Sequence, residues 1–167
     1  EVAYMGCRTR VMANVYDPTR ELTCGRGNLS FTSINLPRIA INAHGNVEWF
    51  FEELERKVNL VIEQLLERFK IQSAKKEVLK HGTLPIGFIG LAECLKALIG
   101  KHHGESKEAQ NLGLEIVGYM RKRMDEEAQK TGLNFSLIAT PAEGLSGRFV
   151  RMDRKKYGEI PGVTDRD

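Results

Sequence analysis

The sequence reads M-G-C-R-T-R-V from Met5 to Val11, G-R-G-N from Gly25 to Asn28 and S-I-N-L-P-R from Ser33 to Arg38. Gly6 lets the backbone bend beside Cys7, and Arg8 and Arg10 place positive charge near its thiol. A thiol in cationic surroundings stays reactive, whereas a lone cysteine is more often a small packed residue. Asn28 lies in a glycine-rich turn that could bring its amide back toward Cys7, although turn geometry alone is its usual role.

Strand and helix patterns alternate outward from this stretch. Short apolar alternation predicts strands over 2–16 and 29–36, and Pro37 is expected to end the second. Asn46 is expected to cap a core-facing helix of about 25 residues. Further elements are predicted as a strand over 84–89 interrupted by Pro85, a helix over 91–99, a helix from Ser106 to Gly132 and a strand over 135–139. This alternation predicts an α/β architecture in which helices cover a sheet or barrel.

Composition indicates one globular domain. The 167 residues are 41% hydrophobic and 28% charged, and the net charge of +3 is too small to indicate nucleic acid or an anionic membrane as a partner. No apolar run approaches the roughly 20 residues of a membrane span, and no signal-peptide pattern is present. Both ends have the look of an internal section of a longer protein.

The cysteines indicate a reducing compartment. Cys7, Cys24 and Cys94 show neither C-x-x-C spacing nor an even count, which argues against a disulfide framework and a zinc site. A Cys7–Cys24 pair across a hairpin is the alternative. Cys94 lies in a helical apolar pattern and is expected in the core.

The segment T-P-A-E at Thr140–Glu143 has the pattern of a capping box, with Thr140 as the N-cap and Pro141 in the first turn. A helix is therefore predicted to begin at Thr140. Its free backbone N–H groups would form an anion site directly after a strand. Glu143 is also able to occupy part of that positive end, so a purely structural cap is the alternative.

Five strings in order resemble the anaerobic ribonucleoside-triphosphate reductases, the oxygen-sensitive glycyl-radical class of ribonucleotide reductase. They are the three strings above, G-F-I-G-L-A-E-C-L at Gly87–Leu95 and A-T-P-A-E-G-L-S-G-R-F at Ala139–Phe149. The resemblance implies that residues 1–167 form one section of a ten-stranded catalytic α/β barrel. The finger loop would span about residues 5–28, and strand–helix units would span 29–167.

The resemblance also implies roles for single residues. The sulfur of Cys7 would become a thiyl radical that takes the 3′ hydrogen atom of the ribose, and Asn28 would orient the ribose hydroxyls or formate. Substrate phosphates would lie near Thr140, Ala142 and Ser146, with Arg148 as a weaker candidate. No residue is expected to bind a metal, and Cys24 has no family role to carry over.

Further expectations concern the whole enzyme. The family uses a C-terminal glycyl radical, a structural four-cysteine zinc site, formate as reductant and ATP or deoxynucleotide effectors, and this sequence has no counterpart of the radical loop or the zinc cysteines. The partners implied are a ribonucleoside triphosphate, an iron–sulfur, S-adenosylmethionine-dependent activase and a second subunit, in the cytoplasm, with neither nucleic acid nor membrane. The chain alone is expected to be inactive in this DNA-precursor synthesis.

Two alternatives stay open. Another glycyl-radical enzyme, of the formate-lyase or diol-dehydratase type, shares the barrel and a loop cysteine. A non-catalytic α/β phosphate-binding module would tolerate Cys7→Ser, whereas a reductase would lose activity and keep its fold.

Overall fold

The computed structural model describes residues 3–5, 9–11, 14–15, 17–19, 26–74 and 81–165. Cys7 and Cys24 lie outside these residues. The elements are β1 Ala3–Met5, β2 Thr9–Val11, β3 Thr32–Asn35, α1 Leu36–Ala43, α2 Val47–Ser73, β4 Thr83–Ile89, α3 Leu91–Ile99, α4 Lys107–Thr131, β5 Asn134–Ala139 and α5 Glu143–Tyr157.

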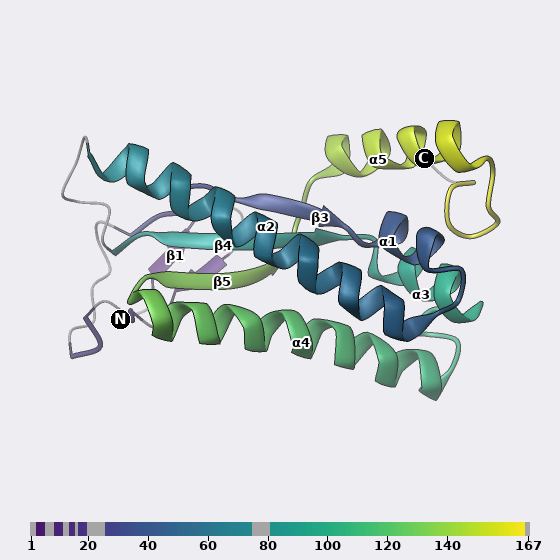
Figure 1. Ribbon diagram of the computed structural model, residues 1–167, viewed down its shortest axis with the longest axis horizontal. Helices are drawn as coiled ribbons and strands as arrows, with labels where there is room; N and C mark the ends of the chain where they lie inside the picture. Colours follow the sequence, from purple (N-terminus) through teal and green to yellow (C-terminus); the bar gives the residue numbers. More distant parts are fainter. Residues whose placement is uncertain are drawn as a thin grey trace.

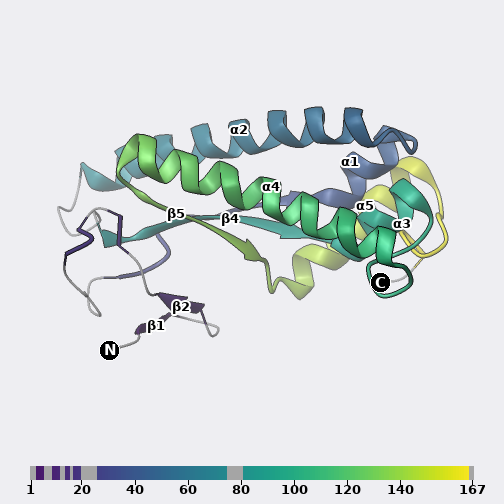
Figure 2. The same cartoon turned by 90° about the horizontal axis from the view of Figure 1, so that it is seen from below.

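Three parallel strands, in the order β3-β4-β5, form the central sheet (Figure 1). The long helices α2 and α4 lie along one face of this sheet (Figure 2). The described parts of the predicted strand over 2–16 instead form a separate antiparallel pair, β1 and β2, in which Met5 pairs with Thr9. The predicted α/β class is therefore confirmed, and a small parallel sheet lies at the centre of the fold.

The two faces of the sheet differ in polarity because side chains alternate along each strand. Large apolar side chains point toward α2 and α4, and those buried to 7% exposure or less are Ile34, Leu84, Ile86 and Phe135. The residues between them in the sequence face the other way. In register they pair Thr83 with Asn134, Pro85 with Ser136 and Ser33 with Gly87. The face that α2 and α4 leave uncovered therefore carries mostly small and polar side chains, together with Ile89 and Ile138. The β1–β2 pair lies on that side (Figure 2).

Three caps predicted for two helices are confirmed. The Asn46 side chain accepts a hydrogen bond from the Trp49 N–H at 3.0 Å and starts α2. Ser106 does the same for Ala109 at 3.1 Å and starts α4. α4 ends at Gly132, whose φ of 70° is the left-handed conformation that glycine adopts without strain. No helix in the described ranges is long and apolar enough to cross a membrane.

Helix α1 is absent from the sequence prediction, which treated Pro37 only as the end of a strand. Pro37 instead occupies the first turn of α1, where its missing N–H costs nothing. Asn35 caps this helix by accepting from the Arg38 N–H at 3.2 Å. His44 closes it in a left-handed conformation with φ 48°. The segment after β3 therefore turns directly into a helix.

Pro85 does not interrupt β4, which contradicts the prediction. The Thr83 N–H donates to the Gly27 carbonyl at 2.7 Å, and the Leu29 N–H donates back to Thr83 at 2.9 Å. In a parallel ladder every second residue of a strand donates its N–H to the neighbouring strand, so a residue with an N–H at position 85 would donate to the Leu29 carbonyl. That carbonyl instead accepts a hydrogen bond from the Gln72 side-chain amide at 3.3 Å. A side chain of α2 thus replaces the donor that proline lacks, and the strand continues.

Candidate functional site

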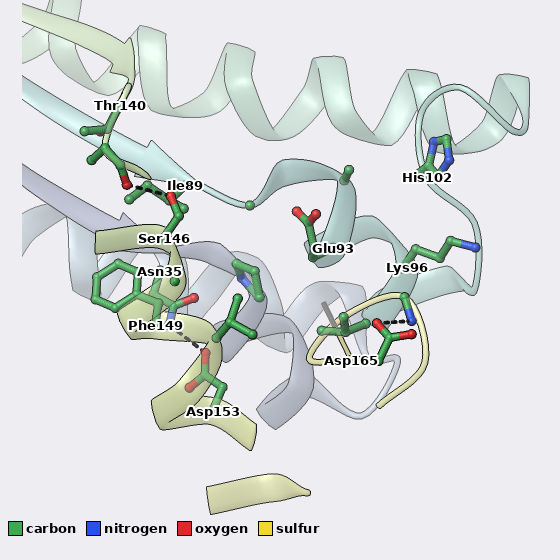
Figure 3. A pocket seen from close by; sticks show the side chains of 18 of the residues that line it. Asn35, Ile89, Glu93, Lys96, His102, Thr140, Ser146, Phe149, Asp153 and Asp165 are labelled. Atoms are coloured by element: carbon green, nitrogen blue, oxygen red, sulfur yellow. Dashed lines mark hydrogen bonds between the residues drawn. The ribbon is translucent and has the colours of Figure 1, made fainter. Parts of the chain in front are cut away.

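A cavity of about 1030 Å³ opens at the carboxyl ends of the three parallel strands (Figure 3). Asn35 ends β3, Ile89 ends β4 and Thr140 follows β5, and all three line the cavity. Helices α1, α3 and α5 each begin within three residues of them. Ligands of parallel α/β sheets bind outside the carboxyl ends of the strands, and the volume is at the upper end of small-molecule sites. This cavity is therefore the candidate substrate pocket.

A pair of hydroxyl groups joins the outer strands beside this pocket, which Thr140 lines. Ser33 Oγ of β3 and Thr140 Oγ1 lie 2.8 Å apart and share a hydrogen bond across β4. They meet directly over Gly87, where an added Cβ would collide with Thr140 Oγ1 and lie 2.6 Å from Ser33 Oγ. The absence of a side chain at Gly87 is therefore what allows the two strand ends to be linked.

The amino end of α5 differs from the capping box that the sequence predicts. The helix begins at Glu143, with Ala142 in the N-cap position and no side-chain cap. Thr140 lies two residues before this N-cap and therefore does not cap the helix; its hydroxyl instead shares a hydrogen bond with Ser33. The first N–H groups of a helix have no partner within the helix. The backbone N–H groups of the first turn of α5 therefore remain available at a pocket wall, with the positive end of the helix dipole.

The three predicted phosphate ligands Thr140, Ala142 and Ser146 all line the pocket, whereas Arg148 is exposed and does not line it. Ser146 Oγ donates to the Ala142 carbonyl at 2.8 Å. The Ser146 hydroxyl hydrogen is thus used within the protein, whereas either hydroxyl of the Ser33–Thr140 pair can be the donor. The backbone amides of the α5 first turn are further donors that the geometry leaves for an anion.

A buried carboxylate that the sequence prediction missed fixes α5 to the rest of the pocket. Asp153 of α5 is 2% exposed. Its Oδ2 accepts from Asn35 Nδ2 at 2.7 Å, and its Oδ1 accepts from Arg38 Nε at 2.6 Å. Figure 3 shows Asn35 and Asp153 facing one another at the pocket wall. Asp153 therefore sets how the amino end of α5 sits against the end of β3.

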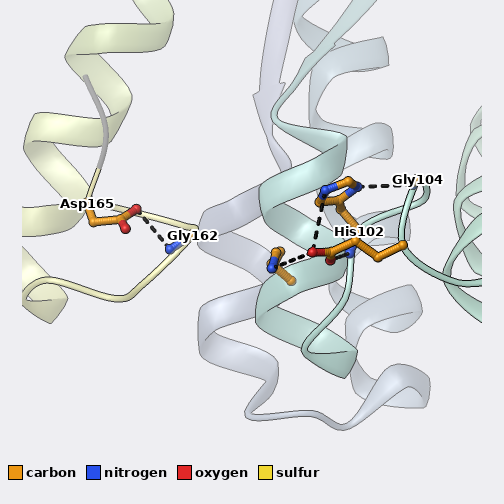
Figure 4. A network of polar contacts seen from close by, with 6 residues as sticks. His102, Gly104, Gly162 and Asp165 are labelled. Atoms are coloured by element: carbon orange, nitrogen blue, oxygen red, sulfur yellow. Dashed lines mark hydrogen bonds and ion pairs between the residues drawn. The ribbon is translucent and has the colours of Figure 1, made fainter.

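The far end of the pocket carries a surface network of Lys96, His102 and Glu105, of which Figure 4 labels His102. The Glu105 carboxylate accepts the His102 backbone N–H at 2.8 Å and contacts Lys96 Nζ at 3.1 Å. Both contacts hold the pKa of Glu105 below its ordinary value, and the hydrogen bond from the His102 backbone has the larger effect. His102 Nδ1 accepts from the Gly104 N–H at 3.0 Å, so that nitrogen carries no proton in this geometry.

Asn28 lies away from this pocket. It forms a parallel bridge with Thr83, at the amino end of β4, and its side chain is exposed. The described part of G-R-G-N is therefore extended beside β4, which corrects the predicted turn. A strand advances about 3.3 Å per residue, which puts Asn28 and Thr140 roughly 20 Å apart along the sheet. The structure brings the phosphate candidates together but leaves Asn28 at the opposite end.

Of the cysteines, only Cys94 belongs to the described residues. It is fully buried, as predicted, and burial, with a smaller contribution from the Glu93 carboxylate, raises the pKa of its thiol far above the ordinary value. Across the described ranges, no three His, Cys, Asp or Glu side chains come together as metal ligands. The residues that can be placed therefore do not fit a four-cysteine zinc site.

Comparison with known proteins gives one consistent result. A family model described as anaerobic ribonucleoside-triphosphate reductase matches residues 1–167. Proteins with this name from Salmonella typhimurium and Escherichia coli are each 31% identical over 97% of this chain. The protein of this name from Enterobacteria phage T4 is 29% identical over 99% of it. The chain spans 26% of the length of each of the two bacterial relatives.

Solved structures show the same fold. The anaerobic ribonucleotide reductase from Thermotoga maritima with citrate in its active site matches 81% of this chain and 28% of its own, with a TM-score of 0.72 and 20% identity. The same enzyme in complex with dATP and CTP matches with a TM-score of 0.70 and 21% identity. Since the family model covers every residue, this chain belongs to the anaerobic ribonucleoside-triphosphate reductase family.

Proposed function

We propose that this chain is the substrate-binding section of an anaerobic ribonucleoside-triphosphate reductase, which converts ribonucleoside triphosphates to deoxyribonucleoside triphosphates. The observation that carries the proposal is the pocket at the carboxyl ends of β3, β4 and β5, where the uncapped amino end of α5 forms one wall. Backbone N–H groups and the helix dipole favour a phosphate there. Thr140, Ala142 and Ser146 would shape this phosphate site, and the first-turn amides would donate to it.

The chemistry is assigned to Cys7. Its sulfur radical would take the 3′ hydrogen atom of the ribose, which forms an S–H bond and leaves a carbon radical, and Asn28 would orient the ribose hydroxyls or formate. Support comes from the family membership and from the polar face of the sheet, on which β1–β2 lies. Met5 and Thr9 pair, and Cys7 lies between them in the sequence.

The remaining parts of the proposal concern the complete enzyme. The three-stranded sheet would belong to a ten-stranded barrel, and the protein would act in the cytoplasm as a homodimer. A glycyl radical, formed by an iron–sulfur activase, would generate the sulfur radical. Formate would supply the electrons, and ATP and deoxynucleotides would regulate turnover. The zinc of the family would have to be bound by cysteines other than Cys94, which is buried in the core.

Turnover by a full-length reductase that contains this region tests the proposal. Cys7→Ser should abolish deoxynucleotide formation and leave nucleotide binding intact, because a hydroxyl cannot replace the sulfur radical. Cys24→Ser is the matched control and should retain turnover. Activity of the Cys7→Ser protein above background would exclude the assignment, as would deoxynucleotide formation by the 167-residue chain alone.

A further inference from the structure

A buried amide lies at the opposite end of the sheet from the pocket. Asn134 is the first residue of β5 and is 5% exposed. Its Oδ1 accepts the backbone N–H of Val15 at 2.7 Å. Its Nδ2 donates to Asn14 Oδ1 at 3.0 Å and contacts the carbonyls of His81 and Gly82 at 3.4 and 3.3 Å. One side chain therefore joins the segment after β2 to the amino ends of β4 and β5.

Asn14 extends this contact to a third side chain. It is 6% exposed, and its Nδ2 lies 3.0 Å from His81 Nδ1. Because the amide nitrogen is only a donor, His81 Nδ1 is the acceptor, and the imidazole proton belongs on Nε2. Asn14 and Asn134 are 120 residues apart in the sequence. We call Asn14, His81 and Asn134 the amide clamp.

We infer that Asn134 is a positioning residue: through the amide clamp it fixes the chain just after β2 to the sheet, and so sets where the β1–β2 pair lies over the polar face. Asn14 follows Val11, the last residue of β2, by only three positions. The described β1 and β2 strands pair with each other and not with the sheet. Hydrogen bonds from the side chains of the amide clamp connect the segment after β2 to the sheet instead. Its catalytic consequence rests on the proposed role of Cys7, which lies between β1 and β2 in the sequence.

The location of the clamp separates its effect from substrate binding. Thr140 directly follows β5 and lies six residues beyond Asn134, a separation of roughly 20 Å at the rise of a β-strand. Loss of the clamp should therefore lower kcat in a full-length reductase and leave KM for the nucleotide within about twofold. A residue that only stabilises the fold would change neither parameter at a temperature where the protein stays folded.

Three variants test the inference. Asn134→Ala removes both the donor and the acceptor. Asn134→Asp keeps the acceptor for the Val15 N–H but has no donor for Asn14, and it serves if the alanine variant fails to fold. Ser136→Ala is the control, since Ser136 lies on the same face of β5 two residues along.

The first readout is amide hydrogen exchange in the 167-residue chain by NMR. Asn134→Ala should speed exchange of the Val15 N–H about tenfold, the factor for one ordinary hydrogen bond, and should also speed exchange in β1–β2. Asn134→Asp should speed exchange of the Val15 N–H less than Asn134→Ala does, because it keeps the acceptor. Unchanged exchange at Val15, or an equal change in Ser136→Ala, would overturn the clamp.

The second readout is turnover of the full-length enzyme. A drop in kcat with KM retained supports positioning, whereas an unchanged kcat or a loss confined to KM overturns it. Cys7→Ser distinguishes the two proposals. If the Cys7→Ser variant keeps its activity, the proposed role of Cys7 is refuted. The hydrogen-exchange result still tests the amide clamp independently.

Discussion

Replacing Asp153 by alanine should destabilise the protein more than any exposed charge substitution. The carboxylate is buried and accepts from Asn35 Nδ2 and Arg38 Nε, so its removal leaves two donors without this acceptor. Hydrogen bonds to a charged group contribute about 1.5–3 kcal/mol each. The Arg38 side chain is 33% exposed, so water compensates part of its loss. We expect the free energy of unfolding to fall by about 2–4 kcal/mol.

Thermal and guanidinium unfolding, followed by circular dichroism, measure this effect. For a chain of this size about 2–4 °C is lost per kcal/mol, so the midpoint should fall by about 5–15 °C. The matched control is Asp125→Ala. Asp125 pairs with Arg121 one turn away on α4, both side chains are more than half exposed, and its loss should cost about 0.5 kcal/mol or less.

Equal destabilisation by the two substitutions would refute the reasoning, since Asp153 is buried and has two partner residues whereas Asp125 is exposed and has one. A loss below about 0.5 kcal/mol for Asp153→Ala would refute it as well, because that is the range of exposed pairs. Asp153→Asn adds a further check. It keeps the shape but places an NH₂ group against one of two donors, and it should fall between the parent and the alanine variant.

Three other predictions concern the pocket and the core. Gly87→Ala should break the Ser33–Thr140 hydroxyl pair and cost about 1–3 kcal/mol by overpacking; a variant as stable as the parent in denaturant titration would contradict this. Because burial raises the pKa of Cys94, iodoacetamide at neutral pH should label it only after unfolding, and peptide mapping that finds labelled Cys94 in the native chain would count against the core assignment. The depressed pKa of Glu105 means that its contribution to stability is complete above the ordinary carboxyl value and is lost as pH falls through the folded value. An NMR titration should give Glu105 a midpoint below that of an unstructured peptide, and Lys96→Met should raise it; a midpoint at or above the peptide value would disprove the contact.

Local signals account for the elements that the sequence predicts correctly. Asn46, Ser106 and Gly132 act within one helical turn of themselves, so their caps are legible without any tertiary information. The fold class follows from the alternation of strand and helix patterns, and the parallel sheet confirms it.

Helix α1 was missed although its signals, Asn35 and Pro37, are local. Two other errors arise where a distant residue decides the local structure. The Thr140 hydroxyl pairs with Ser33 rather than capping α5, and Gln72 supplies the donor that Pro85 lacks. Both partners lie on other elements, so no local pattern reveals them.

The same reason explains the incomplete site prediction. Asp153 and Asn134 act on residues more than 100 positions away and sit in segments that look like an exposed helix and a strand start. Buried polar side chains at strand and helix ends were the signal that sequence reasoning lacked, because burial is a property of the folded chain.

The central claim, that the amino end of α5 binds the substrate phosphates, is tested most directly by titrating the ¹⁵N-labelled chain with a ribonucleoside triphosphate and with the matching nucleoside. The account predicts that the triphosphate shifts the amide resonances of Glu143, Gly144 and Leu145, and that the nucleoside leaves them in place. Triphosphate-induced shifts that avoid these three amides, or equal shifts with the nucleoside, would contradict it.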